Sequence, residues 1–257
     1  MTTPRTDEDT VSFYTEISER YDWIFSEWDE VTRRHADELA PLLAQHEVGT
    51  VLDCACGTGL QAVGLALRGY AVTGCDLTPA MLARAQGRAD RLGLSIPLVQ
   101  CDFRGLGSKI PDAFDAVICM GNSLPHLMTD GDILAALRSM RARVRPGGLL
   151  VIGTRDYDRL LAERTRFIPL RVNTRVSEGL VTILFVLDYL DNRIRFNLVY
   201  IIEGDDGAIR LQADAVDYNS LRCEQLLGLL RQSGFRDVSC ERAGAFCRYT
   251  GIRAAAT

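Results

Sequence analysis

Three acidic residues stand at the ends of successive apolar runs, and a glycine turn follows the first of them. The first run ends at Asp53, before Gly57 and Gly59, and the next two runs end at Asp76 and Asp102. In an open α/β sheet, ligands bind at the carboxyl ends of the strands. The three carboxylates are therefore predicted to face one ligand site.

The glycine turn favours a cationic ligand. A dinucleotide-binding loop has the pattern G-x-G-x-x-G, which places pyrophosphate on a helix N-terminus. This chain has only G-T-G at 57–59, and the carboxylate of Asp53 would repel pyrophosphate and attract an amino group. Asp76, 19 residues after Gly57, is placed to accept both ribose hydroxyls of an adenosine. We therefore expect an adenosyl ligand with a cationic group, and the pattern argues against a NAD-dependent oxidoreductase.

The segment from Thr50 to about Arg155 resembles the class I S-adenosylmethionine (SAM)-dependent methyltransferases. The resemblance rests on the D-x-x-x-G-x-G loop, the two later acids, the run FDAVIC at 114–119 and the turn RPGGL at 145–149. Ala55 departs from the pattern, since many members have a glycine there. The resemblance implies a Rossmann-like sheet that binds SAM and releases S-adenosylhomocysteine, with no metal.

The resemblance also implies which residues hold the cofactor. Residues of the glycine loop would line its methionine half, the pair at 76–77 would bind the ribose, and the pair at 102–103 would hold the adenine. Met81 would contact the adenine ring, although a methionine on a helix that faces a sheet is equally well explained as a core residue. The complete implied set is Asp53, Cys54, Gly57, Gly59, Asp76, Leu77, Met81, Asp102, Phe103 and Met120.

Two further stretches are similar to the glycine/sarcosine N-methyltransferase group: CMGNSLPHL at 119–127 and GTRDYD at 153–158. In that group an arginine at the position of Arg155 pairs with the carboxylate of an amino-acid substrate, and a guanidinium can bind a carboxylate through two hydrogen bonds. The group commonly has HRNYD where this chain has TRDYD, so the arginine and the tyrosine are retained. Arg155 could instead form a salt bridge with Asp156, Asp158 or an acid of the inserted segment.

The other residues implied for the acceptor site are an asparagine, a histidine and several aromatic rings. Asn122 could accept from the substrate amine or hold the cofactor, and His126 could be a catalytic residue or only a packing residue. Methyl transfer from a sulfonium needs alignment and exclusion of water, and burial disfavours a charged amine, so no dedicated base is required. Aromatic rings could enclose the sulfonium by cation–π contacts. The implied catalytic residues are Asn122, Arg155 and Tyr21, and the implied substrate residues are Tyr14, Tyr21, Trp23, Asn122, His126, Arg155, Tyr157 and Tyr218.

Alternating strands and helices must position these residues. A helical segment over 11–45 comes first and carries both tryptophans. From Thr50, strand and helix patterns alternate with short connections, which predicts a doubly wound parallel sheet with helices on both faces. Strands are expected at 50–54, 71–75, 96–101, 114–120 and 149–154, and helices at 60–68, 79–92 and 131–144.

After Arg155 the alternation gives way to an antiparallel pattern. Three strands separated by turn signals predict a β-meander inserted in the parallel domain, and a helix and two more strands follow. The meander strands are expected at 180–190, 193–203 and 209–217, the helix at 221–232, and the last strands around 235–240 and 245–252.

These patterns together predict one domain of the α/β class. It would be a doubly wound, Rossmann-like methyltransferase sheet with a helical N-terminal arm and an inserted antiparallel β-meander. The domain would span 1–257, with the arm at 1–48, the cofactor-binding core at 49–156, the inserted lid at 157–219 and the C-terminal helix and strands at 220–257.

The composition and net charge of the chain limit the kinds of partner that it can bind. The 257 residues are 47% hydrophobic with a net charge of −5, so the chain can bury its own core but lacks the basic balance that favours nucleic acid or an anionic membrane. It has no apolar run long enough to span a bilayer and a polar, acidic start, which predicts a cytoplasmic protein. The eight cysteines are expected to be small buried residues rather than metal ligands. Edge strands of the meander could pair in a homodimer.

The expected function is N-methylation of a small amino-acid-like amine, such as glycine or sarcosine, by a bacterial enzyme. A tailoring methyltransferase of secondary metabolism, acting on N, O or C of a larger scaffold, is the alternative within the same chemistry. A binding module that uses the adenosyl pocket without turnover is the alternative of a different class, although it would not need Asn122 and Arg155. The partner is in each enzymatic case a small molecule.

Overall fold

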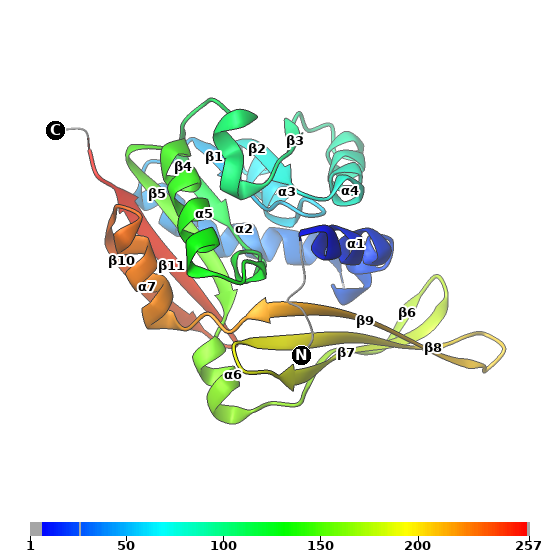
Figure 1. Ribbon diagram of the computed structural model, residues 1–257. Helices are drawn as coiled ribbons and strands as arrows, with labels where there is room; N and C mark the ends of the chain where they lie inside the picture. The colour runs from blue at the N-terminus through cyan, green and yellow to red at the C-terminus, as the bar shows by residue number, and fades with distance from the viewer. Residues whose placement is uncertain (1–6, 26, 256–257) are drawn as a thin grey trace.

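The computed structural model describes residues 7–25 and 27–255, which form two sheets and the helices that pack against them (Figure 1). The larger sheet contains β1 (Thr50–Asp53), β2 (Ala71–Asp76), β3 (Leu98–Gln100), β4 (Phe114–Cys119), β5 (Val144–Arg155), β10 (Phe235–Ala243) and β11 (Phe246–Arg253). Its strand order is β10-β11-β5-β4-β1-β2-β3, with β1 to β5 parallel and an antiparallel edge formed by β10 and β11. The smaller sheet consists of β6 (Phe167–Val176), β7 (Gly179–Tyr189), β8 (Arg193–Glu203) and β9 (Ile209–Asn219), in that order and antiparallel. The expected fold class is thereby confirmed.

Helices cover both faces of the larger sheet. Neighbouring strand residues belong to two different cores, as Val51 and Leu52 do on β1, which explains the near-continuous apolar runs of the parallel strands. One face is covered by α2 (Trp28–Gln45), α3 (Leu60–Ala66) and α4 (Pro79–Arg91), and the other by α5 (Asp130–Arg143) and α7 (Cys223–Gln232). A Cβ on Gly64 of α3 would lie 2.7 Å from the carbonyl oxygen of Thr32, so α2 and α3 pack in close contact. None of the helices in the described residues is long and apolar enough to cross a membrane.

The N-terminal arm is interrupted rather than helical throughout. It forms α1 (Asp7–Ile17), the short 3-10 helix η1 (Tyr21–Ile24) and then α2. Phe25 has extended backbone angles, φ −103° and ψ 129°, which end η1. Phe13 and Ile17 of α1 pack into the core of the smaller sheet. The start of the arm therefore lies between the parallel domain and the meander, where α1 contacts both α4 and β9 (Figure 1).

The inserted sheet has four strands, one more than expected. The sequence does not predict β6, because Pro169, Arg171 and Asn173 interrupt its apolar alternation and its register against β7 shifts on both sides of Arg171. It also does not predict the short helix α6 (Tyr157–Glu163), whose first turn is capped by Asp156. The other predicted elements differ from the observed ones by a few residues at their ends, except that β5 begins early enough to include the predicted RPGGL turn.

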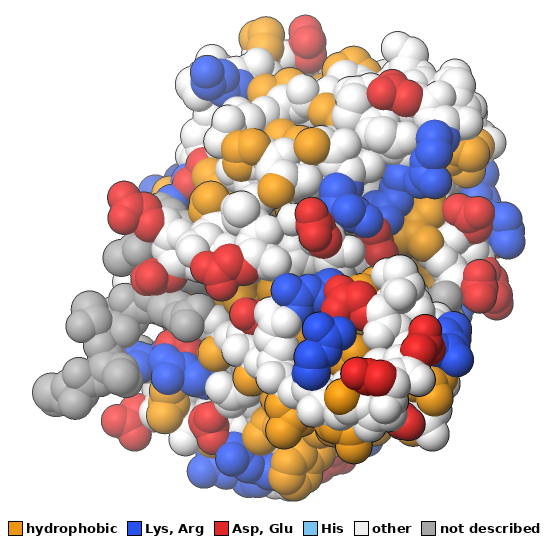
Figure 2. Space-filling model, turned by 90° about the vertical axis from the view of Figure 1, so that its right-hand side faces the viewer, with side chains coloured by type: hydrophobic (Ala, Val, Ile, Leu, Met, Phe, Trp, Pro, Cys, Tyr) orange, Lys and Arg blue, Asp and Glu red, His pale blue; other side chains and the backbone are white. Residues whose placement is uncertain are grey.

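The meander has one buried and one exposed face. Side chains of the inner face, such as Ile183 and Phe196, are fully buried against the rest of the molecule. Large apolar side chains of the outer face are exposed, including Phe167 (61%), Ile209 (67%) and Leu211 (73%). Figure 2 shows apolar side chains gathered at the lower edge of the molecule, where this outer face lies. Only the inner face of the meander therefore contributes to the core.

The carboxylate of Asp217 is the buried charge of the meander. Its Oδ1 accepts from Arg195 Nε at 2.6 Å, and its Oδ2 lies 3.1 Å from Arg193 Nε. We expect Asp217→Asn to lower the free energy of unfolding by about 3–5 kcal/mol, because it removes the buried negative charge that the guanidinium groups of Arg193 and Arg195 contact. Urea denaturation measures the change. The control Asp205→Asn removes an exposed pair with Arg175 and should change the free energy by about 0–1 kcal/mol, and equal effects of the two substitutions would contradict the prediction.

Candidate active site

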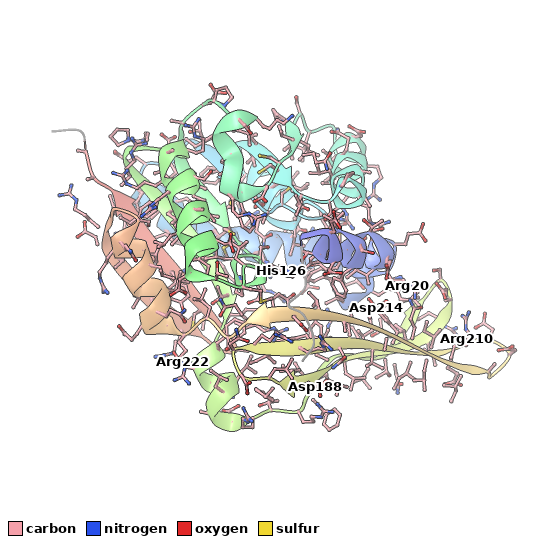
Figure 3. The ribbon with its side chains drawn as sticks, viewed as in Figure 1. Arg20, His126, Asp188, Arg210, Asp214 and Arg222 are labelled. Atoms are coloured by element: carbon pink, nitrogen blue, oxygen red, sulfur yellow. The ribbon has the colours of Figure 1, made fainter. Side chains whose placement is uncertain are left out.

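A cavity of about 990 Å³ lies at the carboxyl ends of β1, β2, β4 and β5. This volume is at the upper end of the range for small-molecule sites. Its walls also come from α1, η1 and the inner face of the meander. Figure 3 shows His126 at the centre of the molecule, where the parallel domain, α1 and the meander meet. Fourteen of the residues implied by the sequence line it: Tyr14, Tyr21, Cys54, Gly57, Asp76, Leu77, Met81, Asp102, Phe103, Met120, Asn122, His126, Arg155 and Tyr218.

Asp76 joins the glycine loop to the end of β2 by a hydrogen bond. Its Oδ2 accepts from the backbone N–H of Gly57 at 2.9 Å, and its Oδ1 accepts from that of Thr78 at 2.9 Å. Burial raises the pKa of Asp76, although these backbone N–H groups oppose the rise. Gly57 has φ +52°, and no atom lies within 4 Å of the place where its Cβ would be. The loop therefore presents open backbone to the cavity, beside a carboxylate that keeps lone pairs free for two hydroxyl groups.

Asp53 and Gly59 lie behind the loop, contrary to the expectation that they line the cavity. Asp53 is fully buried; its Oδ1 accepts weakly from the backbone N–H of Ala55 at 3.4 Å, and its Oδ2 has no partner among the described residues. Burial raises the pKa of Asp53 to about 7. Gly59 packs against α4, where an added Cβ would lie 3.3 Å from that of Ala85. Both residues support the loop rather than form the cavity wall.

Asp102 and Phe103 line the cavity next to β3. The carboxylate of Asp102 is held by Arg104: its Oδ1 accepts from the backbone N–H at 2.7 Å and its Oδ2 from Nε at 2.9 Å. This contact begins the 3-10 helix η2 (Phe103–Ser108). Met81 is only 2% exposed and yet lines the cavity, so it belongs both to the core and to the site wall. Arg104 is a site residue that the sequence analysis does not identify.

Asn122 and Tyr157 join the two stretches that resemble the glycine/sarcosine group. Asn122 has φ +70°, and its Oδ1 accepts from the backbone N–H of Arg155 at 3.0 Å. Its Nδ2 donates to the hydroxyl of Tyr157 at 3.0 Å. Tyr157 is buried and does not line the cavity, contrary to the expectation that it contacts substrate. It positions Asn122, which in turn positions the backbone of Arg155.

The guanidinium group of Arg155 faces three phenylalanine rings. Its Cζ lies 5.3 Å from the ring centre of Phe185, 5.4 Å from that of Phe196 and 5.2 Å from that of Phe246, in a cation–π arrangement. Burial lowers the pKa of Arg155. The three rings come from the meander and the C-terminal hairpin, so no local pattern around residue 155 identifies them.

No acidic residue in the described part of the chain forms an ion pair with Arg155. The two neighbouring acids that could have done so are paired with Arg242, at 3.2 Å from Asp156 and 3.4 Å from Asp158. The interpretation of Arg155 as a structural salt bridge is therefore wrong. The chain instead presents to the cavity a half-buried guanidinium group that has no acidic partner among the described residues.

Tyrosine rings and His126 form the wall next to the arm. The hydroxyl of Tyr14 lies 2.9 Å from Nε2 of His126 and 3.5 Å from the hydroxyl of Tyr218, and the ring of Tyr21 lies against that of Tyr14 with centres 6.1 Å apart. Burial lowers the pKa of His126 to about 4, so its ring is neutral at pH 7, and its Nδ1 has no partner among the described residues. Trp23 does not line the cavity, contrary to expectation, because it packs against Tyr200 of the meander.

A buried arginine links the glycine loop to the arm. Arg88 of α4 donates to the carbonyl oxygen of Thr58 at 2.7 Å, forms an ion pair with Asp22 of η1, and lies 4.0 Å above the ring of Trp28. Arg84 makes a second ion pair with Asp22 at 2.5 Å. The side chain of Arg88 is 7% exposed, so its contacts form in a largely water-free environment. The loop and the arm are therefore held in place by the same side chain.

Comparison with known proteins finds similarity to methyltransferases. A family model described as a methyltransferase domain matches residues 51–148. The glycine/sarcosine N-methyltransferase of Parasynechococcus marenigrum (strain WH8102) is 35% identical over 156 residues, which cover 61% of this chain and 55% of that protein. The glycine/sarcosine N-methyltransferase of Aphanothece halophytica is 28% identical over 225 residues, covering 82% and 78%. The matched part of the chain, residues 51–148, is thus similar to a methyltransferase domain.

Among solved structures, this chain is similar in fold to a SAM-bound amino pentose methyltransferase from Micromonospora echinaspora. The TM-score is 0.74 at 19% sequence identity, and the match covers 99% of this chain and 100% of that one. The likeness extends over the meander as well as the parallel sheet, so the whole fold is shared. The sequence match to the first curated relative, by contrast, spans little more than half of that relative's length.

The link through Arg88 can be broken by one substitution. We expect Arg88→Met to weaken S-adenosylhomocysteine binding by the methyltransferase about tenfold, because the loop carbonyl of Thr58 loses its donor, and to speed proteolytic cleavage near Asp22. Titration calorimetry and limited proteolysis measure the two effects. The control Arg84→Met removes only the second ion pair with Asp22, so it should affect cofactor binding less. An equal loss of affinity for S-adenosylhomocysteine in both variants would contradict the role of Arg88 in holding the glycine loop.

The buried His126 makes stability depend on pH. Its pKa of about 4 in the folded methyltransferase lies below the value of 6.5 for an unperturbed histidine, so the unfolded chain binds the proton more tightly. The stabilisation is present above pH 6.5 and is lost as the pH falls towards 4, by about 2 kcal/mol at pH 5. We expect the difference in free energy of unfolding between the wild type and His126→Gln to fall by about that amount from pH 8 to pH 5. A difference that stays constant over this range would refute the prediction.

Proposed function

We propose that this methyltransferase transfers a methyl group from SAM to the nitrogen of a small amino-acid-like acceptor of the glycine or sarcosine type. The observation that carries the proposal is the guanidinium group of Arg155, which faces the cavity without an acidic partner in the described residues. A half-buried cation without a counter-charge is costly, and the carboxylate of an amino-acid acceptor would supply that charge. The names of the glycine/sarcosine N-methyltransferases among the relatives support the same acceptor class.

Residues around the strand ends would hold the cofactor. Asp76 with Leu77 would bind the ribose, and Asp102 with Phe103 would hold the adenine. The open backbone at Gly57 fits a methionine half that lies against the loop. When bound, SAM supplies an electrophilic methyl group on a sulfonium whose thioether leaves as a neutral group.

The rest of the cavity would orient the acceptor and remove its water. Arg155 would bind the carboxylate through two hydrogen bonds and so fix the direction of the amine. The enclosing rings of Tyr14, Tyr21 and Tyr218 favour the neutral, nucleophilic amine, because burial disfavours an ammonium ion. The neutral ring of His126 adds no positive charge that would repel a sulfonium.

Release of S-adenosylhomocysteine tests the proposal directly. Purified protein with SAM is supplied with glycine, sarcosine or dimethylglycine, and we expect turnover with at least one of the first two. Methylamine, which lacks the carboxylate, serves as the control acceptor and should react poorly. Turnover that does not distinguish the carboxylate-bearing acceptors from methylamine would contradict the role of Arg155.

Two variants separate the cofactor end from the acceptor end. We expect Arg155→Ala to bind S-adenosylhomocysteine as the wild type does and to raise the KM for the carboxylate acceptor about 100-fold, in line with the loss of a buried charge pair. Asp76→Ala should lose cofactor binding in titration calorimetry, because the ribose and the loop N–H of Gly57 lose their acceptor. Unchanged KM in Arg155→Ala for every carboxylate acceptor would show that the amino-acid class is wrong.

A further inference from the structure

The cavity extends to side chains that the proposed reaction does not use. Residues from α2, from β6 and from the C-terminal hairpin line the same 990 Å³ space as the cofactor and acceptor residues, and three of them are arginines: Arg34, Arg171 and Arg248. Two other arginines of the described residues that line the cavity already have a role: Arg155 would bind the acceptor, and Arg104 holds Asp102. The charges around the other three indicate what this part of the cavity can bind.

Arg171 is placed by an irregular strand. The register of β6 against β7 shifts between Pro169 and Arg171 and again between Arg171 and Thr174, and Asn173 has φ +49°. Such bulges redirect a side chain and often occur next to functional sites. NH1 of Arg171 donates to the carbonyl oxygen of Leu170 at 3.1 Å, whereas its Nε is buried and has no partner among the described residues. Two register shifts therefore flank the residue whose guanidinium group lines the cavity.

Arg34 of α2 adds a second positive charge at the same place. Burial lowers the pKa of Arg171, and the charge of Arg34 lowers it further, so the two guanidinium groups repel each other. Among the described residues, Arg34 forms one ion pair, with Glu38 one turn along the same helix, at 4.0 Å with both side chains more than half exposed. A pair of this kind contributes little.

The remaining charges here do not neutralise this pair. Arg248 forms an ion pair with Glu241 and donates to the backbone carbonyl of Glu38 at 3.1 Å, so its own charge is balanced. His35, which also lines this region, has a pKa lowered by burial and is neutral at pH 7. Glu38 also lines the cavity but balances only one of these charges, so Arg34 and Arg171 leave one unbalanced positive charge among the described residues of this region.

We propose that Arg34 and Arg171 bind a second acidic group of the acceptor, a carboxylate or a phosphate, apart from the carboxylate that Arg155 binds. This inference rests on the proposed function and deepens it: the preferred acceptor is an amino acid that carries a second acidic group, and glycine or sarcosine is a weaker acceptor of the same class. Two guanidinium groups provide a fork of donors for such an anion, and its charge removes their mutual repulsion. The part of the cavity beyond a glycine-sized ligand is then the binding site of the acceptor side chain.

Matched pairs of amino acids test the proposal. Titration calorimetry with the S-adenosylhomocysteine-bound protein compares L-glutamate with L-glutamine, and O-phospho-L-serine with L-serine. We expect at least one acidic member to bind tenfold or more tightly than its neutral partner, and the better pair decides between carboxylate and phosphate. Arg171→Gln and Arg34→Gln should reduce this preference to threefold or less while leaving the neutral amino acids unchanged. The control Arg175→Gln, on the same strand but paired with the exposed Asp205, should keep the preference.

The outcomes separate this inference from the proposed function. Methylation of glycine or sarcosine that is impaired by Arg155→Ala supports the proposed function. The second anion site is then overturned on its own if neither pair of amino acids shows a preference, or if Arg171→Gln leaves the preference intact. If no amino acid binds, the proposed function fails, and inorganic phosphate then gives an independent readout. Phosphate binding that is lost in Arg171→Gln and kept in Arg175→Gln would support the anion site, and phosphate binding that is equal or absent in all three proteins would overturn it. Thermal melting shows whether each variant is folded.

Discussion

The buried ion pair between Arg88 and Asp22 joins the parts of the molecule that enclose the cavity. The glycine loop belongs to the parallel domain, η1 belongs to the arm, and the same guanidinium group contacts both while it lies over the ring of Trp28. Each of these contacts would be weak if exposed to water, and burial makes each depend on the others. Tyr21 of the cavity wall lies on η1, so this part of the wall is held next to the glycine loop by one charged side chain.

Much of the fold and of the cofactor end is encoded in local patterns. Short connections between apolar runs and helical patterns predict the parallel sheet, because each unit must pack beside the previous one. The acids at 76 and 102 lie at the cavity because they end strands, and strand ends of a parallel sheet share one edge. The two stretches around Asn122 and Arg155 likewise meet because they follow neighbouring strands, β4 and β5.

Features that depend on distant elements could not be predicted in this way. The three rings around Arg155 come from β7, β8 and β11, and only the packing of the meander and the hairpin brings them together. Asp53 ends a strand as Asp76 does, but its side chain is fully buried and does not line the cavity, and the pattern of residue types does not distinguish the two placements. The strand β6 was not predicted because its bulges break the alternation of apolar and polar residues that indicates a strand.

The hydrogen bond between Tyr14 and His126 would affect the order of events in the proposed reaction. Tyr14 is on α1, so part of the wall of the acceptor site is supplied by a helix that also closes over the cofactor end. The two ligands would then have to enter in a compulsory order, cofactor first, because the acceptor site is complete only after α1 has docked. Spent cofactor would leave only after α1 has lifted again. The residence time of one N-terminal helix, rather than the displacement at carbon, would then set the pace of turnover.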